Sequence, residues 1–480
     1  MSQRNVTAIV LAAGLSTRMK SKTPKVLHSL CGQPVLFYPI KALKDAGITQ
    51  IIVVVHPLYK REVGRFFGLR PQNDTTITFV EQKKPLGTAD AVKTALKKIP
   101  THTKKVLILC GDAPLISSST VKHLLQFHDH NKADISFVSA EFNSESELGR
   151  VVRSAEGKVE RIVEFRDASV DQKNLTEVNS GFYCVEPALL KKISGVKNAN
   201  HKKEFYFTDL VSLIQKACAL KIKNCEEIIG INTRIDLENA RKALQKKINQ
   251  RHMLAGVTLI DAESILIDQQ VHLDSDVTIY PGTYLKGTVS IGNSSIVESH
   301  CFISNSKLAQ NCHIKQGSII EESLLEEGAC VGPLAHLRPG THLKQKAKIG
   351  NFVELKKTVL GKNSKANHLA YLGDALIGND VNIGCGVITC NYDGFAKHKT
   401  IIEDGAFVGS DCQLVAPVRI GKGSYVGSGS TVTKNVPAGS LAIARGKQVN
   451  LEGYAKKIRN KMGKKTEENI EPSKDCHGLQ

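Results

Sequence analysis

The feature that most constrains this chain is an aliphatic residue that recurs at every sixth position in its second half. Neither the 3.6-residue period of a helix nor the two-residue period of a strand produces such spacing. Repeated hexads with glycine or small residues between them predict a parallel β-helix, in which three hexads form one triangular coil. The aliphatic side chains point inward and stack on their copies in neighbouring coils. Three runs carry the pattern: Leu273, Ile279, Leu285, Ile291, Val297 and Ile303; Val331, Leu337, Leu343 and Ile349; and Ile402, Val408, Leu414, Ile420, Val426 and Val432.

The hexad rhythm is interrupted after Ile383. The next aliphatic residue in phase with its own run, Ile402, follows 19 positions later, which is not a multiple of six. The segment CNYDGFAKHK at 390–399 is therefore predicted to leave the coil as a loop. Loops on a rigid scaffold often carry ligand contacts, although a neutral surface insertion gives the same spacing.

The first half of the chain alternates short apolar runs with helix-like segments. Nearly continuous apolar runs are typical of a parallel sheet that helices cover on both faces. This half is therefore predicted to be an α/β doubly wound domain, whose ligands lie at the carboxyl ends of the strands. A polar–apolar stretch at 233–256 is predicted to be a connecting helix. The predicted strands are 6–14, 50–57, 76–82, 105–115 and 133–142, and the predicted covering helices are 35–47 and 88–99.

Length and composition narrow the class of protein. At 480 residues the chain is expected to form two or more domains. It has no run of 18 apolar residues, so no transmembrane segment is expected. The apolar N-terminal segment leads directly into a glycine turn, which favours a buried strand over a signal peptide and predicts a cytoplasmic protein.

Cysteine usage and net charge narrow the class of protein further. The twelve cysteines form no CxxC pair and mostly lie in apolar runs, which favours reduced, buried thiols over a disulfide framework or a zinc site. Metal ligation by Cys385 and Cys390 is the less favoured interpretation. The net charge of +19, without tryptophan or basic–aromatic interleaving, favours anionic small substrates over nucleic acid. A basic segment at 454–465 is predicted to be a solvated tail.

A loop that follows the first strand has the composition of a phosphate site. In LAAGLSTRMKSKTPK, Gly14 allows close approach of backbone N–H groups, and Arg18 and Lys25 add positive charge. Asp112 comes just after an apolar strand, where a carboxylate serves equally well as a Mg²⁺ ligand or as a helix N-cap.

Charged residues in the repeat region suggest a second site. Arg338 and Lys356 are 18 residues apart, which places both cations on one face, one coil apart, about 5 Å by strand spacing. An anion such as a sugar phosphate would relieve their repulsion. His368 lies 12 positions beyond Lys356, on an adjoining face or reaching in from a neighbouring subunit. A neutral imidazole in this company is a suitable general base for an amine nucleophile.

Together these motifs carry a family resemblance. The segments LAAG…TRM…PK, EQKKPLGTADAV, GDAPL, VNSG and GINTR, followed by hexapeptide repeats, closely resemble the bifunctional N-acetylglucosamine-1-phosphate uridyltransferase/glucosamine-1-phosphate acetyltransferases. The resemblance implies a nucleotidyltransferase-like domain at 1–234, a linker helix at 235–255 and a left-handed parallel β-helix with a basic tail at 256–480. It also implies Mg²⁺, acetyl-CoA and UTP as cofactor and co-substrates, and a homotrimer whose sites are built from neighbouring subunits.

The resemblance assigns uridyltransferase roles residue by residue. Lys25 and Arg18 would stabilise charge on the transferring phosphate, and Asp112 and Asn232 would be the Mg²⁺ ligands. The remaining substrate contacts would hold the nucleotide, read the uracil and bind the N-acetylglucosamine moiety: Leu11, Ala12, Ala13 and Gly14; Gln82, Gly87 and Thr88; Cys110 and Gly111; and Gly149, Glu164 and Asn179.

It assigns acetyltransferase roles in the same way. His368 would deprotonate the amine of glucosamine 1-phosphate as it attacks the thioester of acetyl-CoA, and Arg338 and Lys356 would hold the sugar phosphate. The sugar and acetyl group would be positioned by Tyr371, Asn382, Asn391 and Tyr392, and the CoA arm would contact Cys385, Ser410, Ser428 and Arg445.

The sequence departs from the family pattern at four of these places. Ser16 stands where glycine is usual, so the loop is expected to be less free to adopt positive φ. Cys110 and Leu148 stand where an aromatic residue is common, and Cys385 stands where alanine is frequent, which adds a thiol-reactive handle.

Other functions fit part of the pattern. A single-function sugar-nucleotide pyrophosphorylase with a regulatory β-helix explains the N-terminal motifs but leaves NHLAYLGD and CNYDGFAKHK without a role. A non-enzymatic nucleotidyltransferase-like scaffold would not need Gly14, Lys25 and Asp112. A β-helical carbonic anhydrase needs three zinc-binding histidines, and His336, His342 and His368 lack the coil spacing for it.

Overall fold

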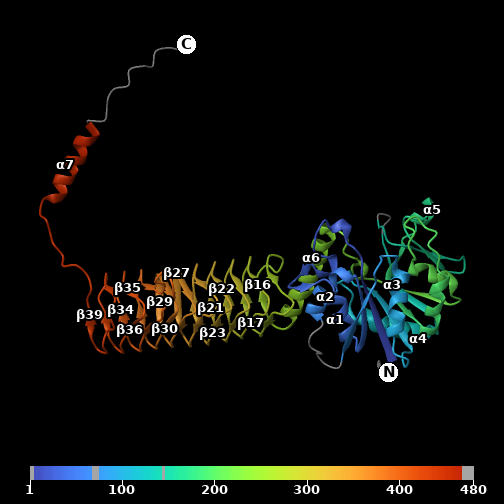
Figure 1. Ribbon diagram of the computed structural model, residues 1–480, viewed down its shortest axis with the longest axis horizontal. Coiled ribbons are helices and arrows are strands. Elements are labelled where there is room, and N and C mark those ends of the chain that lie inside the picture. Colours follow the sequence, from blue (N-terminus) through green and yellow to red (C-terminus); the bar gives the residue numbers. More distant parts are fainter. Residues whose placement is uncertain (1–4, 68–74, 143–145, 468–480) are drawn as a thin grey trace, which may run out of the picture. The chain divides into compact units, whose positions relative to one another are not determined.

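The computed structural model describes residues 5–67, 75–142 and 146–467 (Figure 1). Its contacts divide the chain into two compact units, Met1–Lys346 and Ala347–Gln480. The first unit contains a mixed α/β sheet, a long helix and a stack of β-coils. The second contains further coils and a C-terminal helix. The sequence instead predicts boundaries after residues 234 and 255, which separate regions of different function. These boundaries remain a prediction.

A twisted sheet forms the centre of the first unit. Its strands lie in the order β11-β7-β10-β6-β1-β4-β5. The strands β1, β4, β5 and β6 pair in parallel, as predicted, but β10 runs antiparallel to both β6 and β7. The bounds are β1 (Val6–Ala12), β4 (Gln50–Val55), β5 (Thr76–Glu81), β6 (Lys105–Cys110), β7 (Ile135–Glu141), β10 (Glu177–Val185) and β11 (Ala217–Ile222), with β8 (Arg150–Arg153) and β9 (Val159–Val163) beside β10.

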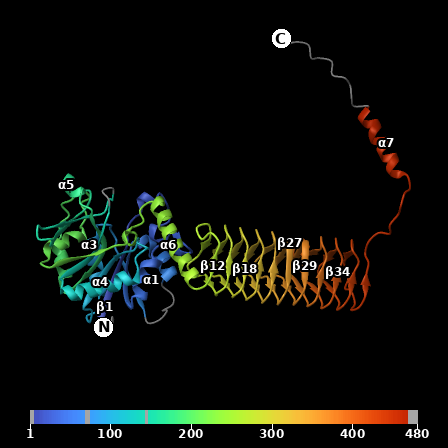
Figure 2. The same ribbon diagram turned by 180° about the vertical axis from the view of Figure 1, so that it is seen from behind.

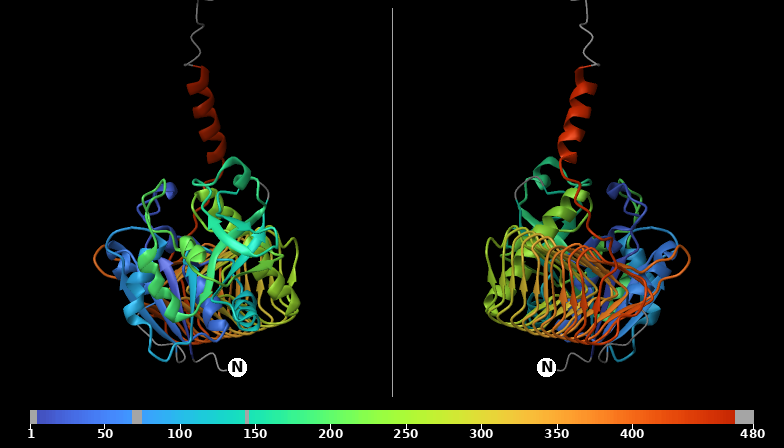
Figure 3. Two further views of the ribbon diagram at one scale, coloured as in Figure 1. Left: turned by 90° about the vertical axis from the view of Figure 1, so that its right-hand side faces the viewer. Right: turned by 90° about the vertical axis from the view of Figure 1, so that its left-hand side faces the viewer.

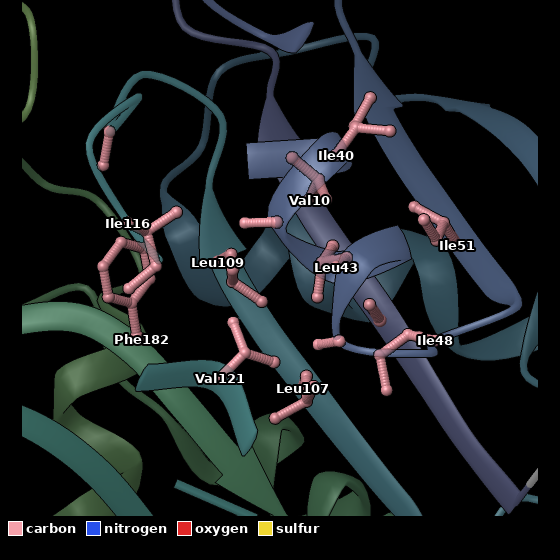
Figure 4. Packing of buried hydrophobic residues seen from close by; sticks show 14 of the residues in the cluster. Val10, Ile40, Leu43, Ile48, Ile51, Leu107, Leu109, Ile116, Val121 and Phe182 are labelled. Atoms are coloured by element: carbon pink, nitrogen blue, oxygen red, sulfur yellow. The ribbon is translucent and has the colours of Figure 1, made fainter. Parts of the chain in front are cut away.

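Helices cover both faces of this sheet, which explains the continuous apolar runs. On one face, α1 (Phe37–Asp45) and α4 (Ser118–Asn131) pack on inward residues of the strands, and Figure 4 shows Ile40 and Leu43 of α1 against Val10, Leu107 and Leu109. On the other face, α3 (Thr88–Ala95) packs on Ile9. The Ile9 side chain is fully buried and lies on the face of the sheet opposite to that of Val10. Burial of both alternating sets is what a doubly covered sheet requires.

The predicted connecting helix is α6 (Arg234–Leu254), and its start is set by a capping box. The Thr233 side chain accepts from the Asp236 backbone, and the Asp236 carboxylate accepts from the Thr233 backbone. Figure 2 shows α6 beside the first coils of the same unit. There Asn249 donates to the carbonyl oxygens of Ala262 and Ile265 at 2.7 and 3.0 Å, which ties the helix to the first coil.

The coils confirm the six-residue interpretation. In the first unit, short parallel strands run from β12 (Thr258–Leu259) to β26 (His342–Leu343), with coil repeats of 18 residues, as in His272 to Ser290, or 17, as in Ser290 to Lys307. In Figure 3 these strands form near-parallel rungs. Every aliphatic residue of the three predicted runs is buried. The 17-residue coils explain why the phase of the hexads changes between the first two runs.

The second unit begins with two long paired strands, β27 (Lys348–Lys356) and β29 (Lys365–Gly373), in a 17-residue register. Later coils include β30 (Ala375–Ile377), β31 (Asn382–Ile383), β32 (Ile388–Cys390) and β33 (Thr400–Ile402), and they end at β39 (Leu441–Ala442). Ala375 pairs with Thr400, a repeat of 25 residues. The extra chain lies between β32 and β33, so the loop predicted from the broken rhythm is confirmed. The helix α7 (Tyr454–Glu467) follows the coils.

Within the described parts of the chain, no helix is both long and apolar enough to cross a membrane.

Candidate functional site

The predicted phosphate loop connects β1 to the short helix η2 (Thr17–Met19). Ser16 adopts a φ of 58°, so the loop takes a left-handed conformation at this position although no glycine stands there. The serine hydroxyl compensates for the left-handed backbone, because it donates to the Gly14 carbonyl at 3.2 Å and accepts from the Lys25 backbone N–H at 3.1 Å. Ser16 therefore fixes the loop conformation and connects it to the segment that carries Lys25.

Four predicted residues from three segments meet beyond the ends of β1 and β6. The Lys25 ammonium forms a short contact with the Asp112 carboxylate and donates to Asn232 Oδ1 at 3.2 Å. Arg18 donates to the same Asn232 oxygen at 3.0 Å. The backbone brings the segments together, since the Ile231 N–H donates to the Asp112 carbonyl at 2.9 Å. The result is two cations that face a carboxylate and an amide oxygen at the sheet edge where an α/β fold binds ligands.

The structure excludes one of the two interpretations of Asp112, that of a helix N-cap. The N-cap of α4 is Ser117, whose hydroxyl accepts from the Thr120 N–H at 3.1 Å. Asp112 caps no helix, and its carboxylate faces the cluster of Lys25 and Asn232. Carboxylate and amide oxygens suit Mg²⁺, and the ammonium held between them indicates that a cation fits there.

The residues predicted to read the uracil form a second cluster after β5. Gln82 is buried and donates to the Gly87 carbonyl at 3.1 Å and to the Asp90 carboxylate at 2.9 Å. Gly87 has a φ of 115°, and a Cβ there would lie 2.4 Å from the Phe205 carbonyl oxygen. Thr88 accepts from the Phe207 N–H at 2.8 Å. Glycine at 87 is thus required for α3 to start at this point.

The residues predicted to bind the sugar lie around the antiparallel strand β10. Asn179 donates from its backbone to Gly149 at 2.8 Å and from its side chain to the Tyr183 hydroxyl at 2.6 Å. The Glu164 carboxylate accepts from Thr208 Oγ1 at 3.0 Å, and burial raises the pKa of Glu164. Tyr183 and Thr208 were not predicted, because β10 breaks the parallel pattern that guided the sequence interpretation.

Cys110 and Gly111 border this region at the end of β6. Gly111 N–H donates to the Leu11 carbonyl at 2.9 Å, and a Cβ at Gly111 would meet that oxygen at 3.0 Å. Burial raises the pKa of the Cys110 thiol to about 12. Cys110 is therefore a neutral packing group and not a nucleophile. Leu148 is partly buried against the sheet core.

The predicted acetyltransferase residues fall in both units. Arg338 belongs to the first unit and is half-buried, and its carbonyl accepts from Thr341 Oγ1 at 2.7 Å. Lys356 ends β27 in the second unit and pairs in register with Gly373. The predicted approach of these two cations, 18 residues apart in sequence, remains a prediction.

His368 lies on β29 and is exposed. It stands in register with Asn351 of β27, and its Nδ1 lies 3.2 Å from the Asn351 Oδ1. When Nδ1 donates its hydrogen to this oxygen, Nε2 keeps its lone pair, the form that a general base needs. Leu369 has a φ of 37°, which turns the chain between His368 and the following residues. Asn351 was not predicted, since only the coil register shows that it faces His368.

Tyr371 and Asn391 converge over a glycine. A Cβ at Gly373 would lie 2.6 Å from Tyr371 Oη and 2.7 Å from Asn391 Nδ2. Asn391 is buried and donates to the Asp374 carboxylate at 2.6 Å. The absence of a side chain at 373 therefore allows two predicted substrate residues from successive coils to meet.

The loop after Asn391 is organised around Asp393. Its carboxylate accepts from the backbone N–H groups of Phe395 and Ala396 at 2.8 and 2.7 Å and contacts His398 at 2.7 Å. These hydrogen bonds lower the pKa of Asp393. The Tyr392 hydroxyl donates to the Gly394 carbonyl at 2.6 Å, and the Tyr392 ring is exposed. The loop therefore has a defined internal structure.

The residues predicted to contact CoA line one corner of successive coils. Asn382 and Ile383 of β31 pair with β34 (Phe407–Val408), which pairs with β37 (Tyr425–Val426), so the residues that follow stack as well. Backbone N–H groups connect this column, from Asp411 to the Cys385 carbonyl at 2.7 Å and from Gly429 to the Ser410 carbonyl at 2.8 Å. The exposed column consists of Cys385, Ser410, Ser428 and Arg445, whose guanidinium donates to the Ser428 carbonyl at 2.7 Å.

Glycines allow neighbouring coils to approach closely at this corner. A Cβ at Gly384 would lie 2.6 Å from backbone atoms of Gly409 and Ser410, and a Cβ at Gly409 would lie 2.6 Å from the Ser428 nitrogen. The coils therefore stack backbone against backbone immediately beside the predicted CoA contacts.

No zinc-type cluster is present among the described residues, where no three histidine, cysteine or acidic side chains come together. His336 and His342 instead face Glu321 and Glu326 at 3.1 and 2.8 Å. Cysteines in the described ranges are unpaired, including the exposed Cys385.

Comparison with known proteins identifies two matching family models and several similar full-length proteins. A family model described as nucleotidyl transferase matches residues 7–249, and one described as bacterial transferase hexapeptide (six repeats) matches residues 399–434. A bifunctional protein GlmU from Pelobacter propionicus is 47% identical over 95% of this chain and 99% of its own length. Proteins of the same name from Trichlorobacter lovleyi and Geotalea uraniireducens are 45% and 44% identical, each over 94% of this chain and 98% of their own length.

Proposed function

The chain belongs to the GlmU family of bifunctional transferases, and on this basis we propose that one residue set around Lys25 performs uridylyl transfer and another around His368 performs acetyl transfer. The enzyme acetylates glucosamine 1-phosphate with acetyl-CoA and transfers UMP from UTP to N-acetylglucosamine 1-phosphate, releasing pyrophosphate. The proposal concerns which residues carry each step.

In uridylyl transfer, a phosphate oxygen of the sugar 1-phosphate attacks the α-phosphorus of UTP, and the bond to pyrophosphate breaks. Two anions must be aligned and their charge neutralised, which is mainly a problem of positioning and electrostatics. Lys25 and Arg18 supply fixed positive charge, and the Gly14 loop supplies backbone N–H donors. The contact of both cations with Asn232 supports a shared role, because it holds them at one end of the sheet.

Asp112 and Asn232 are the proposed holders of Mg²⁺. Their oxygens already share one cation, the Lys25 ammonium, so the donor set fits a hard metal ion. When bound, Mg²⁺ would supply further neutralisation of phosphate charge.

In acetyl transfer, the proposed base His368 removes a proton from the amine of glucosamine 1-phosphate. The amine nitrogen forms a bond to the thioester carbonyl carbon, the carbon–sulfur bond breaks, and the departing CoA thiolate takes up the proton to give the free thiol. The 3.2 Å contact with Asn351 supports the required tautomer. Arg338 and Lys356 are proposed for the sugar phosphate, and Tyr371, Asn382, Asn391 and Tyr392 for the sugar and acetyl group. Cys385, Ser410, Ser428 and Arg445 are proposed for CoA.

The assembly and location belong to the same proposal. In a homotrimer, neighbouring subunits would supply parts of each acetyltransferase site. The hexapeptide fold is consistent with such an assembly. A cytoplasmic location is supported by the unpaired cysteines of the described ranges, since reducing compartments keep thiols free.

The observation that carries the proposal is the contact of Lys25 with both Asp112 and Asn232, three residues that the family resemblance assigns to one site. The test supplies glucosamine 1-phosphate, acetyl-CoA, UTP and Mg²⁺ and measures released CoA thiol and pyrophosphate separately. Asp112→Ala should lower uridylyl transfer about 100-fold or more and leave acetyl transfer within twofold. His368→Ala should do the reverse.

The outcomes separate the alternatives. Pyrophosphate release without acetyl-CoA-dependent thiol release would favour a pyrophosphorylase with a regulatory β-helix. Loss of both activities from either substitution would mean that the two residue sets are not independent.

A further inference from the structure

The strand β10 contains a bulge that lies inside the proposed sugar site. Its register with β7 shifts between Asn179 and Tyr183, and Gly181 within the bulge has a φ of 79°. In a regular strand, side chains four residues apart would be about 13 Å apart along the strand. Here the Asn179 Nδ2 lies only 2.6 Å from the Tyr183 hydroxyl. The bulge therefore has a specific consequence: it brings these two side chains into hydrogen-bond contact.

The Gly181 backbone and the Tyr183 hydroxyl together fix the orientation of the Asn179 amide. The Gly181 backbone N–H, which can only donate, lies 3.3 Å from Asn179 Oδ1. The oxygen must face Gly181, so the Nδ2 group faces Tyr183 and gives one of its two hydrogens to the phenol oxygen. The second Nδ2 hydrogen has no partner among the hydrogen bonds of the described residues, and it is available to an acceptor oxygen.

Tyr183 is itself held rigidly. Its side chain is buried, and its ring packs edge-on against Phe207, with ring centroids 4.8 Å apart. Burial and the nearby Glu164 carboxylate raise the pKa of Tyr183 well above its usual value, so the phenol stays protonated at physiological pH. Phe207 is followed in the chain by Thr208, whose hydroxyl donates a hydrogen bond to the Glu164 carboxylate. Tyr183 thus contacts Asn179 directly and lies near enough to Glu164 for that carboxylate to influence its pKa.

The bulge is bordered by Cys110 at the end of β6. A Cβ at Gly181 would lie 2.8 Å from the Cys110 sulfur, so the bulge depends on a glycine at position 181.

We propose that Tyr183 is a positioning residue for sugar binding: its hydroxyl orients the Asn179 amide so that the free N–H donates to an oxygen of the N-acetylated hexosamine 1-phosphate. The inference rests on the proposed role of Asn179 in the uridyltransferase site. Tyr183 acts through Asn179 and need not touch the reacting phosphates.

The test compares steady-state kinetics of the full-length enzyme and its Tyr183→Phe variant, which keeps the ring and removes the hydroxyl. The KM for N-acetylglucosamine 1-phosphate should rise about tenfold, while the KM for UTP changes less than twofold. In the Asn179→Ala background, Tyr183→Phe should cause no further rise in the sugar KM, because the group it orients is absent. Asn179→Asp, which keeps the acceptor for Gly181 and removes both N–H donors, should raise the sugar KM at least as much.

Tyr38→Phe is the matched control, since Tyr38 is also buried and donates its hydroxyl to a backbone carbonyl, that of Leu30. It should leave both KM values unchanged. An unchanged sugar KM in Tyr183→Phe, equal rises in both KM values, or additive effects with Asn179→Ala would overturn the inference. If Asn179→Ala itself leaves the sugar KM unchanged, the proposed sugar site is wrong, which is a separate result.

Discussion

Lys25 and Asp112 are in direct contact although 87 positions separate them in the sequence. Both side chains are largely buried, with 16% and 17% of their surfaces exposed. The pair lies where the loop after β1 meets the end of β6, and Asn232 closes the group from a third segment. The sheet topology therefore brings together the charges proposed for uridylyl transfer.

Replacing the cation of this pair should disable one reaction only. Lys25→Gln removes the charge proposed for the transferring phosphate, and uridylyl transfer should fall by about 100-fold or more in kcat/KM. Pyrophosphate release measures this loss, and CoA thiol release on the same preparation is the control. A fall of less than fivefold would remove Lys25 from the catalytic group.

A single methyl group at Gly373 should abolish acetyl transfer. The added Cβ would meet Tyr371 Oη and Asn391 Nδ2 at 2.6 and 2.7 Å, so both side chains must move. We expect Gly373→Ala to lower thiol release at least tenfold while pyrophosphate release is retained. Gly64→Ala in α2 (Lys60–Phe67) is the control, because nothing lies within 4 Å of its Cβ. Full acetyl transfer by Gly373→Ala would show that Tyr371 and Asn391 need not converge.

The thiol of Cys385 should report on acetyl-CoA binding. It is the one exposed cysteine among those in the described ranges, and it lies in the column with Ser410 and Ser428. Treatment with a maleimide should inactivate acetyl transfer, and prior addition of acetyl-CoA should slow the loss. Cys385→Ala should stay active and resist the reagent. Inactivation of Cys385→Ala at the rate of the parent enzyme would place the sensitive thiol elsewhere.

Stability should fall on mild acidification because of His252 in α6. Burial, with Arg251 and His272 nearby, lowers the pKa of His252 from 6.5 to about 4. The folded state thus favours the neutral imidazole, so its stabilising contribution is complete above pH 6.5 and is lost as the pH falls towards 4. The loss should reach about 2 kcal/mol near pH 4.5.

Thermal unfolding at pH 7.5 and 4.5 checks this expectation. The decrease in melting temperature of the first transition should be smaller in His252→Gln than in the parent chain. Identical decreases in both proteins would assign the acid sensitivity to other groups.

The sequence predicted the coils because their aliphatic residues recur at every sixth position, and the parallel strands because their apolar runs are nearly continuous. The buried residues of the hexads and of β1 and β4 follow directly from these two patterns. It did not predict β10 or Tyr183, because an antiparallel strand with a bulge leaves no periodic signal. It also missed Asn351, whose relation to His368 depends on a 17-residue register that no local pattern reveals. The contact of Lys25 with Asp112 was expected only through the rule that ligands meet at strand ends.

The glycines at 384 and 409 set a practical limit on redesign. Atoms added at either position would separate neighbouring rungs, since main chain already meets main chain there. An engineer seeking acceptance of a different acyl donor should leave these two positions unaltered and vary Cys385, Ser410 and Ser428 beside them. Those three side chains are exposed, so replacing them disturbs no buried packing.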